Sequence, residues 1–178
     1  MKNILLIFLF LFCTIKTNSY SSTSLIDNKY TETNNQRLFI IERNMNKNIV
    51  CYDAKVTKTG KLNIDDPIDA YWIDYATDGK RSELNYIQRK MAYGFEFEKI
   101  NNDKIYLILK AFDKRKILVY IDSRGTSRAL IKINGIDAIL NKIFVDAKPK
   151  LYTSVNFIEL FGTDIKTGKT IYEKISDL

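Results

Sequence analysis

Histidine is absent from all 178 residues of this chain. Because histidine is the commonest general base and metal ligand, its absence excludes serine–histidine and cysteine–histidine nucleophile pairs. Cysteine is scarce too, and Cys13 and Cys51 alone cannot complete a zinc site of nitrogen and sulfur ligands. The sequence therefore predicts no metal centre and no cofactor.

No long hydrophobic run marks a membrane-spanning helix, because the N-terminal apolar run Ile4–Phe12 is too short to cross a bilayer comfortably. Lys2 precedes this run, and small side chains follow at Thr17 and Ser19. This arrangement is typical of a secretory signal peptide cut after Ser19. We therefore expect a cleavable signal at 1–19, export to the periplasm or the medium, and no transmembrane span in the mature chain.

Disulfide support is also missing, because cleavage after Ser19 would leave Cys51 as the one thiol of the exported form. Phe12 lies directly before Cys13, where lipid attachment requires a small residue, which argues against a lipoprotein anchor. Loss of Lys2 and Lys16 with the signal leaves 26 basic and 21 acidic residues, a net charge of +5. That modest excess suits an anionic envelope and does not predict nucleic-acid binding.

The mature chain is long enough for one domain with a real core. Its first part, 20–36, is rich in Ser, Thr and Asn and predicts a flexible leader before a single domain at 37–178. From Leu38 onward, short apolar runs alternate with turn residues at intervals of roughly ten, which is typical of antiparallel β-structure. About ten strands are expected, at 38–41, 49–54, 70–75, 95–100, 105–112, 117–121, 129–133, 136–145, 152–161 and 170–175.

The predicted fold class is mainly all-β, an antiparallel meander that forms a barrel or a strongly bent sandwich. Asn134-Gly135 is the strongest hairpin signal, since both central positions of a type I′ turn need a positive φ. One segment, 82–93, changes to helical spacing and predicts the single helix, with Ser82 as N-cap and Gly94 after its end.

Several sequence blocks carry a resemblance to a known family. They are Tyr71-Trp72-Ile73, Asp78-Gly79-Lys80, Gln88-Arg89-Lys90, Ala92-Tyr93-Gly94, Ala129 to Gly135 and Ile158 to Asp164. In these blocks the chain resembles a family of exported bacterial proteins known only as a domain of unknown function. The resemblance covers Leu38 to Lys174 and implies one conserved domain, with no catalytic residues to carry over.

Alternation along 70–75 places Asp74 on the same face as the only tryptophan, Trp72. If this face points inward, Asp74 needs a partner, and Arg89 on the predicted helix is a candidate. We therefore predict an aromatic ligand site of Trp72, Tyr75 and Tyr93, with Asp74 and Arg89 as its polar groups. The simpler alternative is an ordinary structural ion pair between Asp74 and Arg89.

Residues 80–150 carry sixteen Lys and Arg against eight Asp and Glu. Within them, Lys110, Lys114, Arg115 and Lys116 surround an expected turn at Phe112. These residues could bind anionic headgroups while Phe112 enters a membrane interface, or they could form an ordinary charged rim.

Three function classes follow from these observations. The first is a non-enzymatic domain that binds a small apolar or anionic ligand, or a membrane surface. The second is a histidine-free hydrolase of envelope glycans, with Asp74 or Glu159 as a catalytic carboxylate beside a Tyr or Lys. The third is a structural or partner-binding envelope protein with a filled core. No catalytic residue is assigned.

Overall fold

The computed structural model describes residues 35–44, 47–148 and 155–176. The expected signal peptide and all but the last two residues of the expected leader lie outside these ranges. Asn35 and Gln36, the last two residues of the expected leader, are hydrogen-bonded to the folded body. The Asn35 carbonyl accepts from the Ser127 N–H at 2.9 Å, and the Gln36 carbonyl accepts from the Ala54 N–H at 2.8 Å.

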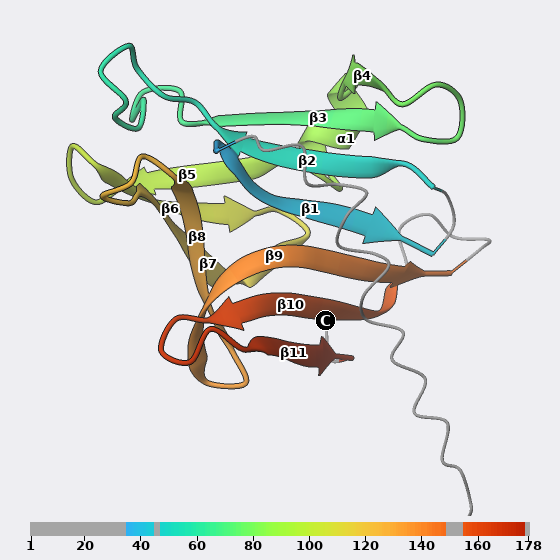
Figure 1. Cartoon of the computed structure of the whole chain (residues 1–178). Helices are drawn as coiled ribbons and strands as arrows, with labels where there is room; N and C mark the ends of the chain where they lie inside the picture. Colours follow the sequence, from blue (N-terminus) through green and yellow to red (C-terminus); the bar gives the residue numbers. More distant parts are fainter. Residues whose placement is uncertain (1–34, 45–46, 149–154, 177–178) are drawn as a thin grey trace, which may run out of the picture. The chain divides into compact units, whose positions relative to one another are not determined.

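The described body is mostly β, as the sequence predicts, with eleven strands in one curled half-barrel sheet and one short helix (Figure 1). In chain order the elements are β1 (Arg37–Arg43), β2 (Ile49–Ala54), β3 (Ile68–Asp74), β4 (Lys80–Glu83), α1 (Tyr86–Lys90), β5 (Phe95–Lys99), β6 (Lys104–Leu109), β7 (Phe112–Ile121), β8 (Ser127–Ile133), β9 (Ile136–Ala147), β10 (Val155–Asp164) and β11 (Thr170–Ile175).

Strand β9 joins the parts of the sheet. Its first half pairs with β8, its second half pairs with β1 along the same edge, and β10 pairs along its other edge. The sheet order is therefore β4-β3-β2-β1-β9-β8-β7-β6-β5, with the β10–β11 hairpin attached beside β9. Two arms, β1 to β4 and β5 to β8, thus extend from one long strand.

The β1–β9 pairing departs from the predicted meander, because it is parallel and joins Ile40 to Lys142 across the whole domain. All the other pairings among the described strands are antiparallel. Parallel pairing covers an edge of β1 that a simple meander would leave open, and an open edge exposes unpaired backbone groups. The exposed edge strand β4 is short and charged, which is a common protection of sheet edges.

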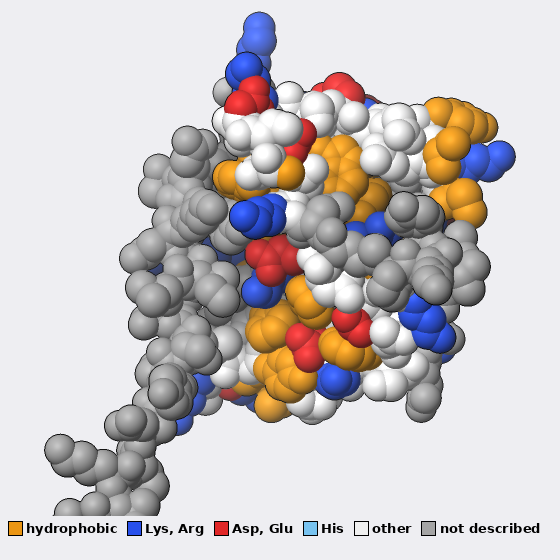
Figure 2. Space-filling model, turned by 90° about the vertical axis from the view of Figure 1, so that its right-hand side faces the viewer, with side chains coloured by type: hydrophobic (Ala, Val, Ile, Leu, Met, Phe, Trp, Pro, Cys, Tyr) orange, Lys and Arg blue, Asp and Glu red, His pale blue; other side chains and the backbone are white. Residues whose placement is uncertain are grey.

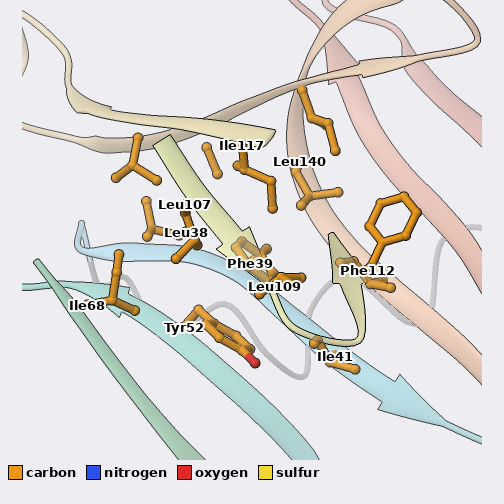
Figure 3. Packing of buried hydrophobic residues seen from close by; sticks show 14 of the residues in the cluster. Leu38, Phe39, Ile41, Tyr52, Ile68, Leu107, Leu109, Phe112, Ile117 and Leu140 are labelled. Carbon is orange, nitrogen blue, oxygen red and sulfur yellow. The ribbon is translucent and has the colours of Figure 1, made fainter. Parts of the chain in front are cut away.

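The core lies between the two arms, where buried side chains from both gather (Figure 3). Tyr52 of β2 stacks on Phe39 of β1, with ring centroids 4.7 Å apart, and meets Phe95 of β5 edge to face at 6.3 Å. Leu107 of β6, Ile117 of β7 and Leu140 of β9 are also fully buried in this core. A core that reaches from β2 to β5 holds the sheet in its curled form.

The β8–β9 hairpin confirms the prediction from Asn134-Gly135. Asn134 has φ of 49° and Gly135 has φ of 77°, as a type I′ turn requires. Ile133 and Ile136 form the last strand pair before this turn.

The helix is shorter than predicted, and its N-cap is Asn85 rather than Ser82. Ser82 lies in β4, where it pairs with Trp72 of β3. The capping box of Asn85 and Gln88 begins the helix three residues later than expected. Pairing with β3 satisfies the backbone of 80–83, so this segment extends the sheet instead of the helix.

Candidate functional site

Trp72 and Tyr93, two members of the predicted aromatic site, come together on the inner face of the sheet. Alternation along β3 turns Trp72 to the same side as buried Ala70, and Tyr93 follows α1 with only 4% of its surface exposed. The two rings meet edge to face, with centroids 5.0 Å apart and planes at 78°. This geometry is favourable for aromatic pairs and fixes both rings in place.

Arg43 is the third member of this cluster, and the sequence interpretation missed it. The guanidinium carbon of Arg43 lies 4.9 Å from the centroid of the Tyr93 ring, within the range of a cation–π contact. Phe39 and Ile41 point inward on β1, so alternation places Arg43 on the same face. The sequence interpretation ended the first strand at Ile41, although two more residues of the same alternation would have identified Arg43.

Three buried polar atoms in this cluster have no hydrogen-bond partner: Arg43 Nε, Trp72 Nε1 and Tyr93 Oη. They are the only such side-chain atoms in the part of the chain that the structure describes. Elsewhere in the same core, buried Tyr52 donates its hydroxyl proton to the Tyr93 carbonyl at 2.8 Å. Because nearly all buried polar groups in native proteins are bonded, three unbonded ones on adjoining side chains call for an explanation.

All three groups can donate a hydrogen bond, and Arg43 adds a positive charge. Burial raises the pKa of the Tyr93 phenol to about 12, although the nearby Arg43 charge opposes this effect. Tyr93 therefore keeps its proton at neutral pH and remains a donor. Within the described ranges no carboxylate forms an ion pair with Arg43. The cluster is thus a set of donors that lacks an acceptor.

The cluster lies near the end of the sheet where β1, β3 and β9 terminate (Figure 1). Arg43 is the last residue of β1 and pairs with Val145 near the end of β9. Val145 is partly buried against the core, so an apolar side chain adjoins the donors. Figure 2 views the described body from this end, where hydrophobic side chains reach the surface beside both basic and acidic groups.

The other predicted members of the aromatic site are placed differently. Arg89 forms an ion pair with Glu83 at 2.5 Å and donates to the Leu84 carbonyl at 2.9 Å. The expected pair of Arg89 with Asp74 is therefore wrong, because the unpredicted strand β4 places Glu83 beside Arg89. Asp74 accepts from the Ala76 N–H at 3.2 Å and supports the turn after β3, and Tyr75 lies in that turn.

The predicted anion patch is largely neutralised by carboxylates. Arg115 binds Glu173 through two hydrogen bonds of 2.7 and 2.6 Å, which connect β7 with β11. Lys116 lies 2.6 Å from Glu98, and Lys110 lies 3.7 Å from Glu96.

The β6–β7 turn lies at Lys110 and Ala111, so Lys114, Arg115 and Lys116 belong to strand β7. Phe112 pairs with Leu109 beside this turn and is buried, so it does not project toward a membrane. The expected turn after Phe112 is therefore wrong. The physical reason is that Phe112 is buried as the first residue of β7, so the hairpin closes before it.

The two carboxylates considered for glycan hydrolysis lie on opposite faces of the sheet. Asp74 shares the inner face with Trp72, whereas Glu159 lies between core residues Ile158 and Leu160 and so points outward. Glu159 accepts a hydrogen bond from the Tyr172 hydroxyl at 3.1 Å. Asp74 and Glu159 therefore do not face each other across a common cleft, as a glycosidase pair must.

Two further findings apply to the described ranges. No three Cys, Asp or Glu side chains among them come together in a way that could hold a metal ion. No helix among these residues has the length and apolar character needed to cross a membrane.

The chain matches no curated protein and no solved structure. A family model does match, over residues 39–174, which cover nearly all of the body that contains the cluster of Arg43, Trp72 and Tyr93. The match confirms the resemblance expected from the sequence blocks. The chain therefore belongs to the family described as a domain of unknown function (DUF4833).

Proposed function

We propose that this domain binds a small ligand through an anionic group that accepts hydrogen bonds from Arg43, Trp72 and Tyr93. The observation that carries the proposal is the set of three buried donors without acceptors on adjoining side chains. Leaving a buried donor unpaired lowers the stability of the protein by about 1–3 kcal/mol. Three such donors are therefore strongly destabilising unless a ligand accepts hydrogen bonds from them. A carboxylate or a phosphate has the acceptor atoms and the charge that this set lacks.

The apolar surroundings indicate what else the ligand carries. Trp72 and Val145 are only partly buried, so their side chains can contact a hydrocarbon or ring portion of the ligand. Ligand sites are commonly apolar with a few polar groups that orient the ligand. An amphiphilic anion therefore suits the cluster better than a free inorganic ion. Export of the domain, predicted from 1–19, would place this binding outside the cytoplasm.

Trp72 is the only tryptophan, so its fluorescence reports directly on the site. We would titrate the protein with octanoate and, in parallel, with the neutral octanol. Octanoate should change the Trp72 emission and bind at least tenfold more tightly than octanol, because Arg43 neutralises the carboxylate. Equal affinities for the two compounds, or no response to either, would contradict the proposal.

A matched pair of variants sharpens this test. Arg43→Gln should lower the affinity for octanoate about tenfold or more and leave octanol binding unchanged. Arg124→Gln removes the same charge from an exposed turn between β7 and β8 and should change neither affinity. If both variants bind octanoate like the wild type, the three donors belong to a filled core, and the structural alternative replaces the binding function.

A further inference from the structure

Helix α1 exposes every one of its apolar side chains. Tyr86 is 74% exposed, Ile87 67% and Met91, directly after the helix, 56%. These values are higher than that of any other large hydrophobic residue in the described ranges. No residue of α1 itself is buried. The helix therefore contributes nothing to the core, although its sequence has the apolar spacing of a packed helix.

The exposed residues are held rigidly from both sides. Leu84 before the helix and Tyr93 after it are buried in the core. The capping box of Asn85 and Gln88 closes the first turn. Gly94 lies so close to the Arg89 carbonyl that a Cβ atom there would lie only 1.8 Å from its oxygen. These contacts present Tyr86, Ile87 and Met91 as a fixed apolar projection, which we call the α1 projection.

Basic groups accompany the α1 projection. Within 84–94, Arg89 is paired with Glu83, so Lys90 supplies the positive charge beside the projection. The Lys90 ammonium lies 5.7 Å from the centroid of the Tyr86 ring and is exposed to solvent. A long basic side chain beside an exposed aromatic and aliphatic group is typical of segments that lie in a membrane interface. The charge favours an anionic surface over a neutral one.

We propose that the α1 projection docks the domain onto an anionic lipid surface. Tyr86, Ile87 and Met91 enter the boundary between headgroups and acyl chains, and Lys90 contacts the headgroups. A protein partner fits less well, because a stable interface buries about 800 Å² on each side and three side chains on a short helix offer much less. A bilayer needs no matching shape, so a small apolar projection with adjacent positive charge is sufficient.

The test is cosedimentation with vesicles, using the chain purified from the cells that make it in its natural processed form. The probes are vesicles of phosphatidylcholine alone and vesicles with phosphatidylglycerol added. The wild type should bind the phosphatidylglycerol vesicles. Replacing Tyr86, Ile87 and Met91 together by Ser should lower the partition coefficient at least tenfold, because apolar area is lost from the interface.

The matched control replaces Ile100, Ile136 and Ile165 by Ser, since these hydrophobic residues are also exposed but lie at the ends of β5, β9 and β10. This variant should bind like the wild type, and Lys90→Glu should bind phosphatidylglycerol vesicles more weakly. Absence of wild-type binding, or equal losses in the two triple variants, would overturn the proposal. An α1-dependent dimer in ultracentrifugation without vesicle binding would overturn it in favour of a second copy. Arg43→Gln should keep full vesicle binding, so failure of the ligand site is distinguishable from failure of docking.

Discussion

The indole of Trp72 meets the phenol of Tyr93 edge to face, and each of the two side chains carries a buried polar atom without a partner. Arg43 lies against the Tyr93 ring as well and carries the third such atom. Tyr93 is thus the shared contact of a cluster drawn from β1, β3 and the segment after α1. The unpaired donors should lower the stability of the free protein. They should also bind an acceptor group of a ligand.

A co-purified ligand should depend on Trp72. Native mass spectrometry of the protein from its own host should detect an added mass of an amphiphilic anion. Trp72→Ala should abolish this mass, and Trp72→Phe should reduce it, because phenylalanine keeps an aromatic face but lacks the indole N–H. An unchanged added mass in both variants would place the ligand elsewhere.

Removal of the Tyr93 hydroxyl should not weaken the empty protein. Tyr93→Phe deletes a buried group with no partner, so the free energy of unfolding should stay the same or rise by about 1 kcal/mol. Tyr52→Phe deletes a hydroxyl that donates to the Tyr93 carbonyl, and it should cost about 1 kcal/mol. Urea denaturation measures both values, and a clear loss of stability in Tyr93→Phe would show that its hydroxyl is satisfied.

The stability of the domain should fall at alkaline pH because Tyr93 is buried. Its pKa is raised to about 12 by burial, whereas an unfolded tyrosine titrates near 10. Between these values the unfolded state has released a proton that the folded state still holds, so stability falls as pH rises. One such group contributes about 1.4 kcal/mol per pH unit in this window and nothing below pH 10. Tyr93→Phe should reduce the slope of unfolding free energy between pH 10 and 12, and identical slopes would refute the assignment.

The Arg115–Glu173 pair should stabilise the attachment of β11. The two hydrogen bonds of Arg115 lower the pKa of the Glu173 carboxyl, so this contribution is lost as acid protonates Glu173. Arg115→Ala should lower the free energy of unfolding by about 1–3 kcal/mol at neutral pH. Lys116→Ala breaks a more exposed pair with Glu98 and should cost under about 1 kcal/mol. Thermal unfolding at pH 7 compares them, and equal costs would contradict a structural role for Arg115.

Part of the site could be predicted from the sequence because it depends on local alternation. Trp72 follows the two-residue period of β3, so its inward direction can be inferred from the neighbouring residues alone. Arg43 follows the same rule on β1 but was missed because Glu42 and Arg43 suggest the end of a strand. The predicted ion pair between Asp74 and Arg89 is wrong because it depended on a helix that begins at Ser82. In the folded chain, pairing of β4 with β3 overrides the local helical preference of 82–83.

The strands other than β4, most of the turns and the β8–β9 hairpin follow from the sequence alone, because alternation and positive φ at Asn134 and Gly135 are properties of neighbouring residues. The parallel pairing of β1 with β9, the contact of Arg43 with Tyr93 and the bond of Arg115 to Glu173 arise only in the folded chain. These contacts link residues about 50 or more positions apart in the chain. They depend on how the sheet curls around its core, which no local pattern encodes.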